Sequence, residues 1–121
     1  MRPMTQTVLI VDDHAGFRAS ARSLLECGGF SVVGEAETGA EAIELARRLQ
    51  PAIVLLDVQL PDLDGFEVAE RLRDVDDPPQ VILTSTRESA DYGSLIASAP
   101  ACGFVGKGEL SADALRALLA A

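Results

Sequence analysis

The stretch from Val54 to Gly65, which reads VLLDVQLPDLDG, decides the fold. Its apolar first half is typical of a buried strand, and this strand ends in the carboxylate of Asp57. Pro61 and Gly65 interrupt regular structure, so a loop is expected to follow. Chemistry usually lies on such loop rims. The pattern therefore predicts a buried strand that delivers Asp57 to the edge of a sheet.

A second apolar run ends in the same way. Val8 to Val11 reads VLIV and precedes the acidic pair Asp12 and Asp13. The carboxyl ends of parallel strands lie at one edge of a sheet, so we expect the three carboxylates to converge. Like charges in one pocket repel unless a cation lies between them. The two runs predict a small acidic metal site with one carboxylate placed for phosphoryl chemistry.

Composition narrows the class of protein. The chain has 121 residues, of which 48% are hydrophobic, and we expect a single domain over residues 1–121. The formal net charge is −9, with 10 Lys and Arg against 19 Asp and Glu, which disfavours direct nucleic-acid binding by this domain. No apolar run has membrane-spanning length, so the expectation is a soluble, cytoplasmic protein without membrane contact.

The two cysteines, Cys27 and Cys102, lie far apart and do not have the spacing of metal ligands. Small apolar thiols are usually buried, and free thiols persist in a reducing compartment. We therefore expect both to be buried free thiols.

Strand and helix patterns alternate five times along the chain. Apolar runs predict strands at 7–11, 30–36, 52–56, 80–83 and 103–106. The second of these alternates weakly, which suits a sheet edge. Helical spacing of apolar residues predicts helices at 17–27, 38–49, 65–73, 88–99 and 111–119. The alternation predicts an α/β fold, an open doubly wound parallel sheet with helices on both faces.

Local signals mark several helix ends. Gly28 and Gly29 should stop the first helix. Thr38 and Glu41 have the spacing of a capping box, and Ser111 is placed to cap the last helix.

Polar and aromatic residues also mark the ends of the fourth and fifth predicted strands: Thr84, Phe104 and Lys107. With the acidic pair, and with Asp57 followed by Pro four positions on and Gly eight positions on, this order resembles the receiver domain of bacterial two-component response regulators. The resemblance covers about residues 7–119, and the segments VDDH and GFVGK are similar to receivers of the NarL/FixJ type. It implies a flavodoxin-like fold with five parallel strands in the order 2-1-3-4-5.

The resemblance also implies a chemistry. Asp57 is then the acceptor of a phosphoryl group from a histidine kinase or phosphotransfer protein. Mg²⁺ is the implied cofactor, held by Asp13 and Asp57, with Asp12 acting through water and the backbone carbonyl of Gln59 completing the protein ligands. Such a domain catalyses only its own phosphorylation and dephosphorylation and is otherwise not an enzyme.

The same resemblance assigns a switch. Lys107 pairs with one phosphoryl oxygen and the hydroxyl of Thr84 donates to another. That contact draws the loop after the fourth strand inward, and Phe104 turns toward the vacated space. The implied output face comprises the fourth helix, fifth strand and fifth helix, which contact a downstream partner protein or form a phosphorylation-dependent homodimer.

Other interpretations of these residues remain open. Ser85 carries the same hydroxyl chemistry as Thr84, and Phe104 is equally well an ordinary core residue. His14 is expected to be a solvent-facing residue at a helix start rather than a ligand. Gly108 follows Lys107 where many receivers have proline, so the cis-proline of those receivers has no counterpart here.

Three alternative functions compete with a stand-alone receiver, which is the favoured interpretation. The chain could be the N-terminal receiver of a longer DNA-binding transcriptional regulator. It could be a pseudo-receiver that binds proteins without taking phosphate, although the joint presence of the acidic, hydroxyl and lysine residues argues against this. A small Asp-nucleophile phosphatase is disfavoured because Gln59 stands where such enzymes carry a second Asp.

Overall fold

The described strands and helices follow one another in the predicted order. The computed structural model describes residues 6–86 and 99–120. Its elements are β1 (Thr7–Val11), α1 (Ala15–Cys27), β2 (Ser31–Ala36), α2 (Gly39–Leu49), β3 (Ile53–Asp57), α3 (Gly65–Leu72), β4 (Gln80–Ser85), β5 (Gly103–Gly106), the short 3-10 helix η2 (Lys107–Glu109) and α5 (Ala112–Ala120).

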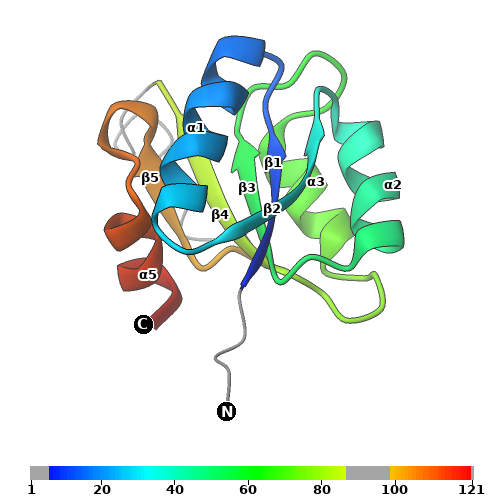
Figure 1. Cartoon of the computed structure of the whole chain (residues 1–121). Helices are drawn as coiled ribbons and strands as arrows, with labels where there is room; N and C mark the ends of the chain where they lie inside the picture. Colours follow the sequence, from blue (N-terminus) through cyan, green and yellow to red (C-terminus); the bar gives the residue numbers. More distant parts are fainter. Residues whose placement is uncertain (1–5, 87–98, 121) are drawn as a thin grey trace.

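All five strands form one parallel sheet in the order β2-β1-β3-β4-β5. This confirms the predicted α/β class and strand order, and β2 lies at an edge as expected. β1 and β3 are neighbours inside the sheet, with Val11 opposite Leu56. The residues that follow β1 and end β3 are therefore brought to the same edge (Figure 1).

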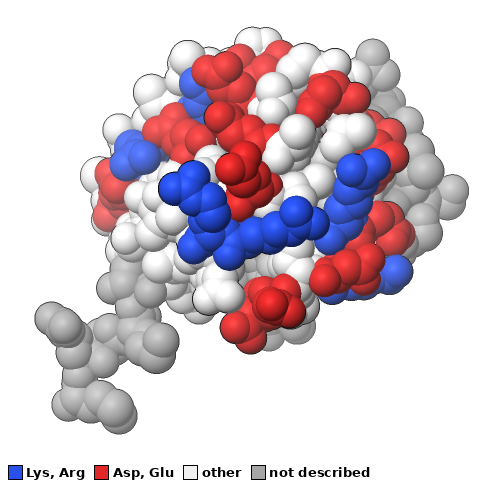
Figure 2. Space-filling model, turned by 90° about the vertical axis from the view of Figure 1, so that its right-hand side faces the viewer, with Lys and Arg blue, Asp and Glu red and all other residues white. Residues whose placement is uncertain are grey.

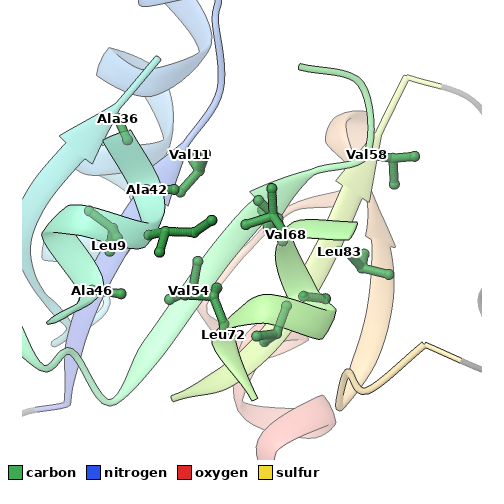
Figure 3. Packing of buried hydrophobic residues seen from close by; sticks show 14 residues of the cluster. Leu9, Val11, Ala36, Ala42, Ala46, Val54, Val58, Val68, Leu72 and Leu83 are labelled. Atoms are coloured by element: carbon green, nitrogen blue, oxygen red, sulfur yellow. The ribbon is translucent and has the colours of Figure 1, made fainter. Parts of the chain in front are cut away.

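Helices cover both faces of the sheet, with α2 and α3 on one side and α1 and α5 on the other (Figure 1). Successive strand residues point to opposite faces, so each strand contributes to both cores. Leu9 and Val54 pack with residues of α2 and α3, as Figure 3 shows. Ile10 and Leu55 pack toward α1 and α5. Burial on both sides explains why the central strands are apolar throughout.

The end of α1 corrects one prediction. Cys27 and Cys102 are free cysteines, but both are exposed, so the expectation of buried thiols was wrong. Cys27 lies two positions after the buried Leu25. Two positions correspond to a rotation of about 200° around the helix, so Cys27 faces away from the core. Cys102 precedes β5, where its backbone N–H bonds to the carbonyl of Val81 at 2.7 Å while its side chain faces outward.

Two of the side-chain caps that begin helices were predicted from the sequence. The hydroxyl of Thr38 accepts from the N–H of Glu41 at 3.1 Å, which confirms the predicted cap of α2. The reciprocal bond differs, because the Glu41 carboxylate accepts from the N–H of Glu37 at 2.7 Å rather than from that of Thr38. The predicted cap at Ser111 is also confirmed, with its hydroxyl accepting from the N–H of Ala114 at 2.9 Å.

One predicted strand end differs from the structure, and one predicted helix lies outside the described residues. β4 continues to Ser85, so Thr84 and Ser85 are strand residues rather than the loop after a strand. The helix predicted at 88–99 falls almost wholly on residues 87–98, which lie outside the described residues. In the part of the chain that is described, none of the helices combines the length and apolarity needed to cross a membrane.

Acidic and basic side chains are mixed on the α2 side of the molecule, the right-hand side of Figure 1 (Figure 2). Arg71 lies 3.7 Å from Glu67 and Arg73 lies 3.2 Å from Glu70, both at exposed positions on or next to α3. Exposed pairs of this kind contribute little to stability. The ion pairs on this side therefore add little to the stability of the fold.

Candidate functional site

Asp12, Asp57 and Lys107 meet at the carboxyl edge of the sheet. Asp12 directly follows β1, Asp57 ends β3 and Lys107 directly follows β5. The residues two positions earlier all belong to the core beneath α1 and α5: Ile10, Leu55 and Val105. Because side chains alternate along a strand, the three site residues point toward the same layer of helices.

The ammonium of Lys107 lies between two buried carboxylates. Its Nζ is 2.5 Å from Asp12 Oδ2 and 3.3 Å from Asp57 Oδ2. Asp12 is 0% exposed and the Lys107 side chain is 11% exposed. The same ammonium lies 4.7 Å from the centroid of the Phe17 ring, a favourable cation–π position. One buried cation thus holds together two carboxylates that would otherwise repel.

The pKa values of this group reflect its burial. Burial raises the pKa of Asp57, a hydrogen bond from the N–H of Gln59 opposes that rise, and the negative charge of Asp12 adds to it. For Lys107, burial works against the charged form, but the hydrogen bond to Asp12 and the charge of Asp57 outweigh it and raise its pKa. The site therefore favours an extra positive charge beside the two carboxylates.

An acidic turn completes one side of the site. The side chain of Asp13 is 39% exposed, and His14 Nδ1 lies 3.1 Å from Asp13 Oδ1 and 3.2 Å from Asp12 Oδ1. The backbone N–H of His14 also donates to Asp12 Oδ1 at 2.8 Å. The ring is 72% exposed, in agreement with a solvent-facing residue at a helix start. Among the described residues, ligand atoms of Asp12, Asp13, His14 and Asp57 lie within 4.8 Å of one another.

The loop after β3 folds back on the strand end. The N–H of Gln59 donates to Asp57 Oδ1 at 3.1 Å, and Gln59 forms an isolated antiparallel bridge with Asp64. The N–H of Gly65 donates to the carbonyl of Val58 at 2.6 Å. These bonds hold Gln59 beside Asp57 and turn the chain into α3.

Asp62 ties the same loop to a second helix. Its carboxylate accepts from the N–H of Gly39 at 2.7 Å and from that of Ala40 at 3.0 Å, and these bonds lower the pKa of Asp62. Both donors belong to the first turn of α2, whose N–H groups have no partner within the helix. The loop that carries Gln59 is thereby anchored to the layer of helices on the opposite face.

A pocket of about 240 Å³ opens above these groups. It is lined by Asp13, His14, Asp57, Gln59, Leu60, Pro61, Thr86 and Lys107. Its walls thus combine carboxylates, a lysine and a hydroxyl-bearing residue. Carboxylates are hard oxygen ligands that suit a small divalent ion, so the donor set fits Mg²⁺.

The predicted switch residues occupy different positions. Thr84 is the register partner of Asp57 in the sheet, is buried, and its hydroxyl has no hydrogen-bond partner among the described residues. Alternation points Ser85 to the opposite face, toward α2 and α3. Phe104 is half-buried, is the register partner of Leu83, and packs against the core on that opposite face. The structure therefore brings Thr84 beside Asp57, whereas Phe104 lies on the other side of the sheet.

One residue near the site was missed by the sequence analysis. Arg18 of α1 donates from Nη1 to the backbone carbonyl of Asp12 at 2.7 Å. Its side chain is 11% exposed and also bonds to Glu35 of β2. The sequence signal was weak, because a single arginine on a helix is most often exposed.

The strand order and the acidic edge site together define a flavodoxin-like α/β domain of the receiver class. The family model of the response regulator receiver domain matches residues 8–120. The chain belongs to this family, and it is a receiver domain of the two-component signalling type.

Known proteins agree with this assignment. The chain is 40% identical over 110 residues to a Pseudomonas aeruginosa protein named as a transcriptional regulator, covering 91% of this chain and 53% of that protein. It is 37% identical to the transcription regulator BvgA of Bordetella pertussis, covering 88% of this chain and 51% of that protein. It superposes on the signal receiver domain of NarL from Mycobacterium tuberculosis with a TM-score of 0.86 and 33% identity, covering 98% and 96% of the two chains.

The chain spans about half the length of the curated relatives that it matches. Their names describe regulators of transcription, whereas the shared region corresponds to the receiver domain.

Proposed function

We propose that this receiver accepts a phosphoryl group on Asp57 from the phosphohistidine of a histidine kinase or phosphotransfer protein. The observation that carries the proposal is the placement of the Asp57 carboxylate beside both the Lys107 ammonium and the acidic turn at Asp12 and Asp13. A carboxylate oxygen of Asp57 forms the new bond to phosphorus while the bond from phosphorus to the donor imidazole breaks, so the group is transferred without loss of atoms.

Mg²⁺ is the cofactor that this donor set fits. Asp13 and Asp57 would hold the ion directly, Asp12 would act through water, and the backbone carbonyl of Gln59 would complete the protein ligands. When bound, the ion offsets the negative charge of the incoming phosphoryl group. The clustered carboxylates support this assignment, and the hydrogen bond from Gln59 to Asp57 keeps the loop in place.

Lys107 and Thr84 are proposed to receive the phosphoryl oxygens. Lys107 already lies 3.3 Å from Asp57 and can pair with one oxygen as a point charge. The buried hydroxyl of Thr84 is next to Asp57 in the sheet. It has no hydrogen-bond partner among the described residues, so it can donate to a phosphoryl oxygen. We propose that this new bond and a movement of Phe104 convert the charge into a change of the output face, which includes β5 and α5.

Control of transcription is the proposed setting. The relatives named as transcriptional regulators are about twice as long as the matched region. The receiver would act as the phosphorylated part of such a regulator, through a downstream partner protein or a phosphorylation-dependent homodimer. A pseudo-receiver role is the second candidate, and the phosphorylation experiment separates the two.

The test is intact mass after incubation with Mg²⁺ and acetyl phosphate. We expect one phosphoryl adduct on the wild type, none without Mg²⁺ and none on Asp57→Asn. Asp113→Asn is the matched control, because the Asp113 side chain is fully exposed on α5. Beryllium fluoride, a stable mimic of the phosphoryl group, is added in parallel to detect a site whose adduct hydrolyses quickly. A wild type that neither gains mass nor binds beryllium fluoride would be a pseudo-receiver.

A further inference from the structure

Arg18 connects the acidic turn to the edge strand β2. Nη1 donates to the carbonyl of Asp12 at 2.7 Å, Nε bonds to Glu35 at 3.0 Å, and Nη2 lies 3.4 Å from Glu37. All three nitrogens of the guanidinium therefore have oxygen partners, and the planar group can take only one orientation.

The carbonyl of Asp12 lies in the peptide plane that leads to Asp13. A peptide unit is rigid, so a bond that fixes the carbonyl of Asp12 also fixes the amide of Asp13. The other side of Asp12 is held as well, because its N–H donates to the carbonyl of Ala36 at 3.0 Å. The Asp13 side chain is 39% exposed and contacts His14 at 3.1 Å, and the direction in which it leaves the chain is set by this backbone.

Charge alone would make Arg18 unfavourable at this position. A guanidinium next to a cation site repels the cation, and the guanidinium of Arg18 bonds directly to a backbone carbonyl of the acidic turn. Glu35 and Glu37 offset that charge. Burial raises the pKa of Glu35, but the hydrogen bonds and the positive charges of Arg22 and Arg18 together outweigh it and lower that pKa. The two glutamates thus keep the Arg18 guanidinium in a fixed orientation while reducing its repulsion of a cation at the acidic turn.

We infer that Arg18 is a positioning residue of the metal site, which aims the Asp13 carboxylate by fixing the peptide plane between Asp12 and Asp13. The inference rests on the proposed Mg²⁺ site. Glu35 holds the guanidinium in place and offsets its charge.

Arg22 provides a matched comparison within the same helix. It bonds to Glu35 through Nε at 2.8 Å and lies 3.6 Å from Glu26. Both of its partners are carboxylates on α1 and β2, and the described contacts do not link it to the acidic turn. Replacing Arg22 thus removes one arginine from Glu35 while leaving the carbonyl of Asp12 bound to Arg18.

The experiment measures the dissociation constant of Mg²⁺ by calorimetry for the wild type, Arg18→Gln, Arg18→Lys and Arg22→Gln. The ring signals of His14, the single histidine of the chain, report the same titration by NMR because His14 contacts both acidic residues. We expect about tenfold weaker binding for both Arg18 variants, the lower end of the effect of outer-shell partners. Arg22→Gln should bind like the wild type.

The sign of the change distinguishes positioning from simple charge. If Arg18 acted only as a nearby cation, Arg18→Gln would bind Mg²⁺ more tightly and Arg18→Lys would bind it unchanged, which would overturn the inference. Equal losses in Arg18→Gln and Arg22→Gln, in step with their melting temperatures, would also overturn it. A wild type that does not bind Mg²⁺ would overturn the proposed metal site first and this inference with it, whereas normal wild-type binding with unaffected Arg18 variants would overturn the inference alone.

Discussion

Gly65 lies against the backbone of Asp57 so closely that a side chain does not fit between them. A Cβ atom at position 65 would stand 2.5 Å from the carbonyl oxygen of Asp57 and 2.7 Å from the Cα of Val58. Both neighbours are backbone atoms, so they cannot move aside by changing rotamer. The glycine eight positions after the aspartate is therefore required by the packing of α3 against the end of β3.

Gly65→Ala should lower both stability and function. We expect a loss of about 1–3 kcal/mol in the free energy of unfolding, the usual cost of overpacking, measured by urea denaturation. Displacement of β3 should also weaken binding of beryllium fluoride. Gly16→Ala in α1 is the control, because a Cβ there meets nothing within 4 Å. A Gly65→Ala protein as stable as the wild type would show that the loop adjusts freely.

Asp57→Asn should change the pH dependence of stability. The pKa of Asp57 is raised, chiefly by burial, so the folded protein binds this proton more tightly than the unfolded chain. Its contribution to stability is thus present below the ordinary pKa of 3.8 and is lost as pH rises through the raised value. Asparagine stays neutral at every pH.

We therefore expect equal melting temperatures in EDTA below about pH 3.8 and a more stable variant at pH 7. Saturating Mg²⁺ should reverse the order at pH 7, since a ligand at 100 times its Kd stabilises by about 2.7 kcal/mol. Scanning calorimetry between pH 3 and pH 8 measures both effects. A constant difference at all pH values would contradict the raised pKa.

Lys107→Gln should leave two buried carboxylates without their cation. Because removal of one partner leaves a buried charge uncompensated, we expect the free energy of unfolding in EDTA to fall by about 3 kcal/mol, measured by urea denaturation. The variant should also gain more than the wild type from Mg²⁺, because the ion no longer competes with the ammonium. Arg71→Gln, at an exposed position paired with Glu67, should change stability by less than about 0.5 kcal/mol. If Mg²⁺ stabilised the wild type and Lys107→Gln equally, the ion and the Lys107 ammonium would not compete for the carboxylates.

Thr84→Val should separate folding from phosphoryl recognition. The Thr84 hydroxyl is buried and has no hydrogen-bond partner among the described residues, so its removal should leave stability unchanged or raise it slightly. Binding of beryllium fluoride, followed by calorimetry, should weaken about tenfold, the value of one hydrogen bond to a charged group. Ser85→Ala is the comparison, since alternation points Ser85 to the other face. A loss confined to Ser85→Ala would transfer the role to Ser85.

Much of the fold follows from local patterns in the chain. The run at Val54–Leu56 is apolar because helices cover β3 on both faces, and that two-sided burial is visible in the sequence. Caps at Thr38 and Ser111 are also local signals. The strand order was not derivable in this way, and it came from the resemblance to receivers. The exposed Cys27 was mispredicted because residue type was given more weight than its position around the helix.

The site was predictable only in part. The residues at or just after strand ends, such as Asp12 and Lys107, could be selected because parallel strands end at a shared edge of the sheet. The bond from Arg18 to Asp12 and the bonds from Asp62 to the start of α2 could not. These contacts depend on how a helix or loop approaches a neighbouring strand, and hydrophobic periodicity carries no information on that approach.

The loop between α3 and β4 leads into the opposite end of the sheet from the site. It spans residues 73–79, where exposed residues such as Asp76 and Asp77 predominate, and it enters β4 at Gln80, five positions before Ser85. This loop is therefore a suitable attachment point for a fluorescent label or a short affinity tag. A reporter placed there could follow the domain in living cells while leaving the carboxyl edge open to the proposed phosphodonor.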